Sequence, residues 1–329
     1  MRIVLCYPVE PRHLRQIAEV APHAELVDAS QERVAEELRE ADIFCGHAKV
    51  PVPWDEIVAR GRLRWIQSTA AGIDHCLTPS VADSDILVTG ASGLFADQVA
   101  EQTLALLLGL LRGLPTFFRQ QQARQYVRRP TGDLHGATVG IVGFGGNGRR
   151  VAEILAAFRT RLLATDMFPE RKPNHVQALW EADKFEELLP LVDVLVLCVP
   201  LTAKTRGMVN ARTLSRMKSG ALLINVARGQ VVVERDLIEA LVSGQLGGVG
   251  TDVNEIEPLP PESRLWELPH VIITPHVGAQ SARRIDDATD LFCENLGRYL
   301  RGEPLWNVVD KELGFPRPTF IWTPKKPGG

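Results

Sequence analysis

Short apolar segments alternate with helix-like segments along most of the chain. The apolar segments are three to five residues long, and helical spacing of apolar residues appears between them, as in Gln31–Glu40 with Val34 and Leu38. This alternation predicts an α/β fold with parallel sheets and helices on both faces. Strands are predicted in a first group at Ile3–Cys6, Ala24–Val27, Ile43–Cys45, Arg64–Gln67 and Ile86–Thr89, and in a second group at Thr138–Val142, Arg161–Thr165, Val194–Cys198, Leu222–Val226, Gly247–Thr251 and Val271–Thr274.

Two segments separate the groups of strands: a long helix starting near Asp97 and the turn-rich stretch Arg129–Asp133. We therefore predict two α/β units. A last helix is predicted at about Ser281–Leu300, and it ends at Arg301-Gly302-Glu303-Pro304. The tail from Phe315 is predicted to be an extended or disordered arm, because it contains Pro316, Pro318, Pro324 and Pro327 beside Gly328 and Gly329.

A glycine-rich turn follows the first strand of the second group. The strand Thr138–Val142 runs into Gly143-Phe144-Gly145-Gly146-Asn147-Gly148 and then into a helical segment, which gives the order strand, G-x-G-x-x-G, helix. In such a turn Gly143 permits the tight bend, Gly145 lets a pyrophosphate approach the backbone, and Gly148 lets the helix pack on the strand. The helix N-terminus then offers N–H groups to the phosphates.

An acidic residue, Asp166, ends the next strand, eighteen residues beyond Gly148. Its carboxylate could accept hydrogen bonds from the hydroxyls of an adenosine ribose. Asn147 departs from the apolar residue usual at its position, which leaves its packing role open. An S-adenosylmethionine methyltransferase could show a similar turn and acid, so the glycine loop alone leaves two function classes.

Three later strand ends carry polar residues. Arg228 follows the strand Leu222–Val226, Glu257 follows Gly247–Thr251, and His276 follows Val271–Thr274. Because the carboxyl ends of strands in a doubly wound sheet face the ligand crevice, these side chains could converge there. Each alone has a structural explanation, as a turn residue, a loop cap or a structural histidine. No close His, Cys and carboxylate spacing favours a metal site.

Five motifs occur in a characteristic order and spacing. They are Val142–Gly148, Cys198-Val199-Pro200-Leu201-Thr202, Asn225-Val226-Ala227-Arg228-Gly229, Asp252 through Pro258, and Thr274-Pro275-His276-Val277-Gly278. In both respects the chain resembles the D-isomer-specific 2-hydroxyacid dehydrogenases, over roughly residues 40 to 310. This family includes glyoxylate/hydroxypyruvate reductases and phosphoglycerate dehydrogenases. A methyltransferase would leave Arg228, Glu257 and His276 unexplained.

The resemblance implies the roles of the site residues. Arg228 would bind the substrate carboxylate and carbonyl, His276 would be the general acid/base, and Glu257 would be its partner. The backbone of Ala71, Gly72 and Ile73 would hold the substrate carboxylate opposite Arg228. NAD would be held by Gly143, Gly145, Gly146, Asn147, Gly148, Asp166, Val199, Pro200, Val226, Ala227, Arg228, Asp252, His276 and Gly278, with Asp252 at the nicotinamide carboxamide.

The resemblance also implies the architecture. It predicts two Rossmann-like, doubly wound parallel-sheet domains with a cleft between them, in which residues 1–98 plus 291–329 form a flavodoxin-like substrate domain and residues 99–290 bind NAD. The hinges would lie near 98 and 290. It further implies a homodimer, with Val99–Leu111 and Pro115–Val127 supplying the apolar contact.

Composition excludes several partners. The net charge is −3 and basic residues form no stripe, so we expect no nucleic-acid partner. We expect no signal peptide and no membrane-spanning helix. The five cysteines are scattered without a CxxC pair, which predicts buried reduced thiols and fits the cytoplasm.

The sequence leaves the substrate open. We expect preference for NADH, because Asp166 would repel a 2′-phosphate, and a small unphosphorylated acid such as glyoxylate or hydroxypyruvate. From the length we expect no separate regulatory domain of the kind that many phosphoglycerate dehydrogenases carry. If Lys49 faced the pocket, a phosphate or second carboxylate on the substrate would become plausible. A phosphoglycerate dehydrogenase and a non-enzymatic NAD(H)-sensing co-repressor stay as alternatives, and in a formate dehydrogenase we would expect Gln in place of Glu257.

Overall fold

The computed structural model describes residues 1–318, and its contacts divide the chain into two units. The first comprises Met1–Phe95 with Ser281–Gly329, and the second Ala96–Gln280. The sequence analysis predicted the second hinge, at which the chain returns to the first unit, near residue 290. That position lies inside a continuous helix, α11 (Arg284–Leu300), so the chain returns to the first unit about ten residues earlier.

The first unit contains a five-stranded parallel sheet of order β2-β1-β3-β4-β5. This order is the flavodoxin-like form of the doubly wound sheet. Each strand lies within one residue of its predicted position. The apolar segments of the inner strands are buried on both faces of the sheet, whereas the edge strand β2 is half-buried or exposed. The strands are β1 (Arg2–Cys6), β2 (Glu25–Asp28), β3 (Ile43–Gly46), β4 (Trp65–Ser68) and β5 (Leu87–Thr89).

Alternate residues of these strands point into two apolar cores. Val4, Phe44 and Ile66 pack on one side, and Ile3 and Trp65 on the other. The first core is covered by α2 (Val34–Glu37), the 3₁₀ turn η1 (Leu38–Glu40), α3 (Trp54–Arg60) and α4 (Pro79–Ala82), and the second by α1 (Pro11–Val20) and α11.

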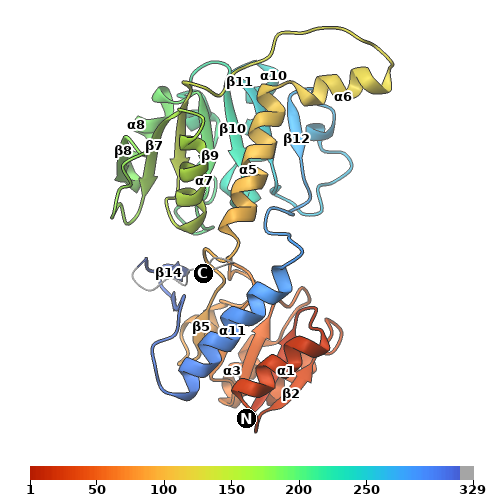
Figure 1. Cartoon of the computed structure of the whole chain (residues 1–329), viewed down its shortest axis with the longest axis vertical. Helices are drawn as coiled ribbons and strands as arrows, with labels where there is room; N and C mark the ends of the chain where they lie inside the picture. Colours follow the sequence, from red (N-terminus) through yellow and green to blue (C-terminus); the bar gives the residue numbers. More distant parts are fainter. Residues whose placement is uncertain (319–329) are drawn as a thin grey trace. The chain divides into compact units, whose positions relative to one another are not determined.

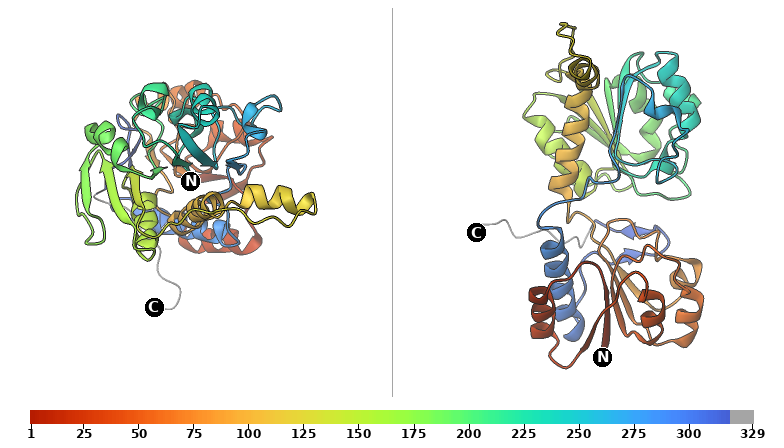
Figure 2. Two further views of the ribbon diagram at one scale, coloured as in Figure 1. Left: turned by 90° about the horizontal axis from the view of Figure 1, so that it is seen from above. Right: turned by 90° about the vertical axis from the view of Figure 1, so that its right-hand side faces the viewer.

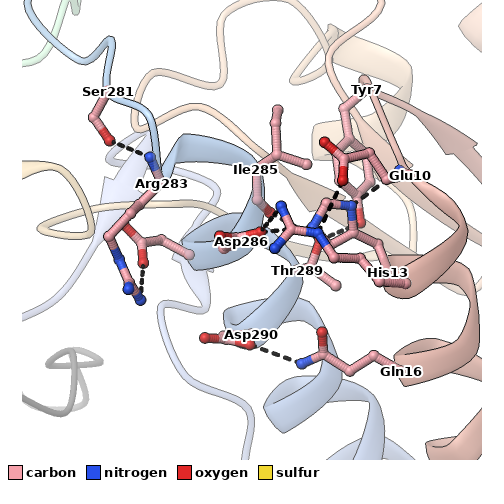
Figure 3. A network of polar contacts seen from close by, with 12 residues as sticks. Tyr7, Glu10, His13, Gln16, Ser281, Arg283, Ile285, Asp286, Thr289 and Asp290 are labelled. Atoms are coloured by element: carbon pink, nitrogen blue, oxygen red, sulfur yellow. Dashed lines mark hydrogen bonds and ion pairs between the residues drawn. The ribbon is translucent and has the colours of Figure 1, made fainter. Parts of the chain in front are cut away.

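Polar contacts fix the start of α11 against α1 (Figure 3). His13 is 2 % exposed; its Nδ1 accepts the Glu10 backbone N–H at 3.0 Å, and its Nε2 lies 2.7 Å from Asp286 Oδ1. An Nδ1 that accepts leaves the proton of the neutral ring on Nε2, which then donates to Asp286. Tyr7 and Thr289 share a hydroxyl contact of 3.2 Å one turn further on. These bonds hold the N-terminal half of α11 against the first unit.

The second unit contains a seven-stranded parallel sheet of order β12-β11-β10-β9-β6-β7-β8. The strand order reverses at β6, with β7 on one side and β9 on the other, so the topological switch point lies where the glycine loop follows β6. The strands are β6 (Thr138–Val142), β7 (Arg161–Asp166), β8 (Ala178–Glu181), β9 (Val194–Leu197), β10 (Ala221–Asn225), β11 (Leu246–Thr251) and β12 (Val271–Ile273).

Helices cover both faces of this sheet (Figures 1 and 2). α5 (Ala96–Leu111) and α7 (Gly146–Ala156) enclose one core with β6, and α8 (Phe185–Leu188), α9 (Ala211–Leu214) and α10 (Glu234–Val242) enclose the other. The remaining elements are α6 (Leu114–Gln122) and the 3₁₀ turns η2 (Ala182–Lys184), η3 (Leu189–Leu191), η4 (Gly229–Val231) and η5 (Arg264–Trp266). Two Rossmann-like α/β units are therefore confirmed.

Two elements differ from the sequence expectation. β8 was not predicted; it is a short edge strand of half-buried side chains without a β-branched residue. Phe315–Pro316, expected in an extended or disordered arm, forms β14 and pairs antiparallel with β13 (Val309–Asp310). The predicted arm beyond Pro318, including Pro324 and Pro327, lies outside the described residues. Within residues 1–318 no helix has the length and apolarity needed to cross a bilayer.

Candidate active site

The glycine loop has the shape that a dinucleotide needs. Gly143 has φ +91°, and a Cβ there would lie 2.8 Å from the backbone of Cys198. A Cβ on Gly148 would lie 2.1 Å from the Gly143 carbonyl oxygen, whereas one on Gly145 would meet nothing within 4 Å. Gly143 and Gly148 thus permit close packing, and Gly145 opens a bare stretch of backbone at the start of α7. This N-terminus carries no side-chain cap, so its N–H groups fit a pyrophosphate.

Asp166 closes the same loop from the end of β7. Its two carboxylate oxygens accept the backbone N–H groups of Phe144, at 2.5 Å, and of Phe168, at 2.7 Å. Arg149 stacks its guanidinium 4.9 Å above the centre of the Phe144 ring and donates to the carbonyls of Glu170 and Arg171. Burial lowers the pKa of Arg149, an effect that the nearby Asp166 opposes. A carboxylate so fixed is suited to accept hydrogen bonds from a ribose.

The other predicted cofactor residues lie at neighbouring strand ends. Val199 and Pro200 follow β9, beside Gly143, and Val226 and Ala227 follow β10. Gly146 and Asn147 form the first turn of α7, with Asn147 half-buried. The structure therefore brings these residues to the carboxyl edge of one sheet.

A short turn at the end of β10 presents Arg228. The buried Asn225 accepts the Ala227 N–H at 3.1 Å through Oδ1 and donates to the Arg228 carbonyl at 3.1 Å through Nδ2. Gly229 is required next, because a Cβ there would lie 1.9 Å from the backbone of Asn254. This close approach brings Arg228 beside the segment after β11.

His276 and Glu257 form a hydrogen-bonded pair. His276 Nδ1 lies 2.9 Å from Glu257 Oε2, and Glu257 Oε1 accepts the Asn254 backbone N–H at 3.0 Å. His276 and Glu257 lie close together because Thr251 of β11 is opposite Ile273 of β12, and both strands end at this pair. About half of the His276 side chain (48 %) is exposed, so its other ring nitrogen is available to a substrate.

The ionisation of Glu257 shows how closely the three residues interact. Burial raises the pKa of this carboxyl, but hydrogen bonds from His276 and Asn254, together with the charges of His276 and Arg228, outweigh it. The net pKa lies below the ordinary value. Glu257 is therefore a carboxylate near neutral pH, and the structure brings Arg228, Glu257 and His276 together as the sequence predicted.

Asp252 has a different setting from the one expected. It is 3 % exposed, and its carboxylate accepts the Thr274 hydroxyl at 2.6 Å, the Val277 N–H at 2.9 Å and the Gly278 N–H at 2.7 Å. These bonds tie Asp252 to the segment that carries His276. The contact to a nicotinamide carboxamide, implied by the resemblance, stays a prediction.

The predicted substrate loop belongs to the first unit. It follows β4, with Ile73 buried and Ala71 exposed, and the carbonyl of Ile73 accepts the N–H groups of Cys76 and Leu77. Within the described residues, the N–H groups of Ala71, Gly72 and Ile73 have no acceptor. They are thus available to a carboxylate. Lys49, on the loop after β3, has an exposed side chain.

Comparison with known proteins places the chain among its relatives. Residues 104–278 match the family described as "D-isomer specific 2-hydroxyacid dehydrogenase, NAD binding domain". The glyoxylate reductase of Korarchaeum cryptofilum is 30% identical, with 92% of this chain and 95% of that protein covered. The chain belongs to the D-isomer specific 2-hydroxyacid dehydrogenase family. The resemblance inferred from the motifs is confirmed.

Two further family members bear on substrate and cofactor. The D-3-phosphoglycerate dehydrogenase of Methanocaldococcus jannaschii is 28% identical over 94% of this chain, which spans only 59% of that protein. A crystal structure of the NADPH-dependent glyoxylate/hydroxypyruvate reductase of Sinorhizobium meliloti, in complex with NADP and sulfate, has a TM-score of 0.80 at 28% identity, covering 95% of this chain and 99% of that one. The matched domain is described as NAD binding, whereas this reductase structure is described as NADPH-dependent.

The sequence analysis missed the residues whose hydrogen bonds hold the segments that carry Arg228 and His276. Asn225 was quoted only as part of a motif, although its amide shapes the Arg228 turn. Thr274 and Gln102, which contact each other at 2.8 Å, received no role. Asn225 and Thr274 each gave one signal, as a polar residue at the end of an otherwise apolar predicted strand, and Gln102 gave none.

Proposed function

We propose that this protein is a reductase of small 2-oxo acids, related to glyoxylate and hydroxypyruvate reductases, which forms the D-2-hydroxy acid. The His276–Glu257 pair beside Arg228 is the observation that carries the proposal. A methyltransferase would leave Arg228, Glu257 and His276 unexplained, and their joint presence is a weaker argument against a protein that only senses NAD(H).

The residues have distinct roles in this reaction. Arg228 binds the substrate carboxylate and carbonyl oxygen through its planar fork of N–H donors. A bound nicotinamide supplies the hydride to the carbonyl carbon. His276 gives a proton from Nε2 to the carbonyl oxygen, so that C=O becomes CH–OH. Glu257, on Nδ1, orients the ring and stabilises the imidazolium before the proton leaves.

The dinucleotide site fits NAD better than NADP. Gly143, Gly145 and Gly148 provide the backbone shape, and the carboxylate of Asp166 favours the two hydroxyls of an unmodified ribose while repelling a 2′-phosphate. Arg171 belongs to the loop that Arg149 holds near Asp166 and could weaken the preference without reversing it. We therefore propose NADH as the preferred cofactor.

The finer architecture also belongs to the proposal. We propose a substrate domain and a cofactor domain corresponding to the two units, a homodimer, and a cytoplasmic setting. Within the first unit, we propose that the backbone N–H groups of Ala71, Gly72 and Ile73 bind a carboxylate. The exposed apolar side chains of Leu114 and Phe118 support a dimer contact through α6.

The proposal is tested with purified protein and a panel of 2-oxo acids, each with NADH and with NADPH. We expect turnover of glyoxylate or hydroxypyruvate with NADH. Clear preference for 3-phosphohydroxypyruvate, abolished in Lys49→Ala, would favour the phosphoglycerate dehydrogenase alternative. Tight NADH binding without turnover of any 2-oxo acid would favour the co-repressor alternative.

A further inference from the structure

The backbone at His276 is held in an unfavourable conformation. His276 has φ +54°, a left-handed value that residues with a Cβ adopt at a cost. Its N–H donates to the carbonyls of Asp252, at 2.8 Å, and Thr274, at 3.0 Å. The surrounding structure must supply bonds that keep this conformation.

The side chain of Asp252 accepts several of these bonds from the segment Thr274–Gly278, which contains His276. Its buried carboxylate accepts the N–H groups of the two residues after His276, Val277 and Gly278, and the hydroxyl of Thr274, two residues before it. A Cβ at Gly278 would lie 2.8 Å from Asp252 Oδ2, so the segment and the carboxylate are in direct contact. One side chain thus fixes the backbone on both sides of the histidine.

Gln102 of α5 completes the chain of hydrogen bonds. Its Nε2 donates to Thr274 Oγ1 at 2.8 Å, and Thr274 Oγ1 donates to Asp252 Oδ1 at 2.6 Å. Because a hydroxyl has one proton, the bond from Gln102 directs that proton toward Asp252. The chain of hydrogen bonds ends on the side-chain oxygens of Asp252, which also accept from the N–H groups of Val277 and Gly278.

We propose that Gln102 and Thr274 are positioning residues of the reductase reaction. They act through Asp252 to hold the left-handed backbone at His276, and so keep its ring against Glu257 with Nε2 toward the substrate. The inference rests on the proposed function, because it concerns the histidine that donates the proton. Neither residue touches the reacting atoms, so their effect appears in the catalytic step and not in cofactor binding.

Substitution of Thr274 tests the inference. Thr274→Val removes the hydroxyl at nearly constant volume, and Thr274→Ser keeps it. With NADH and the best 2-oxo acid, we expect Thr274→Val to lower kcat by about 10- to 100-fold, since a displacement of about 1 Å costs up to about 100-fold. Thr274→Ser should stay within about threefold of wild type, and Gln102→Leu should fall in the same direction as Thr274→Val. The dissociation constant for NADH should change by less than about threefold in all three.

Thr103→Val provides a matched control. Thr103 is the buried neighbour of Gln102 on α5. Among residues 1–318 its hydroxyl bonds only within its own helix, to the Val99 carbonyl at 2.7 Å. We expect its kcat to match that of wild type. Unchanged kcat in Thr274→Val, or a loss that Thr274→Ser does not restore, would overturn the inference.

A second readout needs no turnover. The Glu257 bond protects the Nδ1–H proton of His276 from exchange with water, so we expect its NMR signal in wild type and Thr274→Ser and its loss by faster exchange in Thr274→Val. If wild type reduces no 2-oxo acid but the signal behaves as expected, the proposed function fails and the positioning role stands. A signal that persists in Thr274→Val overturns the positioning role alone.

Discussion

The central residue pair makes a prediction about pH. Glu257 stabilises the imidazolium of His276, and Glu257→Gln removes that charge while keeping a hydrogen-bonding side chain. Reduction needs the protonated ring, so its rate falls as pH rises and the proton is lost. We expect this fall to begin at lower pH in Glu257→Gln than in wild type, measured as kcat/KM for the 2-oxo acid.

The acid side of the same profile follows from Glu257 itself. The pKa of this carboxyl is lowered, so the side chain stays ionised when the pH falls to the ordinary glutamate pKa of about 4.3. Wild-type reduction should therefore keep its rate down to that pH. Glu255→Gln is the control, since Glu255 bonds the Glu234 N–H instead of the histidine. Superimposable profiles for wild type and Glu257→Gln would show that the pair is not functional.

A single carboxylate should decide the cofactor preference. We expect kcat/KM to be at least about tenfold higher with NADH than with NADPH, because a ribose hydrogen bond to a charged acceptor contributes about 1.5–3 kcal/mol. Asp166→Ser should remove most of this ratio. Asp193→Asn, which alters a carboxylate bound to the Thr138 N–H at the opposite end of β6, should leave it unchanged. Equal efficiency with the two cofactors in wild type would refute the role of Asp166.

At the scale of the elements, sequence pattern was most informative where burial is greatest. β6 has the predicted bounds, because five consecutive buried residues lie between a polar segment and a glycine turn. The edge strand β8 escaped prediction, since its four residues are half-buried or exposed and none of them is β-branched. β14 escaped prediction because its segment is rich in proline. In the structure, Phe315 and Pro316 nevertheless pair antiparallel with Asp310 and Val309.

The candidate site shows the same division between pattern and context. Arg228, Glu257 and His276 could be predicted because each polar residue follows an apolar strand in a sheet whose strand ends meet. The role of Gln102 could not be predicted, because its partner Thr274 is 172 residues away in sequence. Long-range pairs of this kind depend on how a helix lies on a sheet, which periodicity does not encode.

The contact between α1 and α11 predicts a stability difference. His13→Ala removes a buried ring and its bond to Asp286, whose pKa that bond lowers. We expect a loss of about 1–3 kcal/mol in the free energy of unfolding, measured by urea denaturation near neutral pH. Since the pKa of Asp286 is lowered, the part of this stabilisation that comes from its bond to His13 should be fully present above the ordinary carboxyl pKa. It should be lost as pH falls through the lowered pKa of the folded protein.

Gln16→Ala is the matched control, because Gln16 bonds Asp290 one turn further along the same two helices, at the exposed surface. We expect a change below about 0.5 kcal/mol. Equal losses in the two variants would mean that the buried histidine contributes no more than a surface contact.

At the scale of the whole molecule, the homodimer is the first prediction. The apolar face of α5 is largely used inside the second unit, where Leu106 and Leu107 are buried, whereas Phe118 and Tyr126 are 57 % and 99 % exposed. We expect the mass of a dimer by light scattering at micromolar concentration, and a monomer for the double variant Phe118→Ser, Tyr126→Ser. Val242→Ser, at an exposed apolar site on α10, should stay dimeric. A monomeric wild-type protein would contradict the prediction.

The catalytic histidine gives the most direct test of the account. Reduction of hydroxypyruvate or glyoxylate by NADH is measured for wild type and His276→Ala, together with NADH binding by fluorescence. The account predicts turnover by wild type, a loss on the order of 10²–10⁴ in kcat for His276→Ala, and NADH binding within a few-fold of wild type. Turnover of His276→Ala close to that of wild type would contradict it.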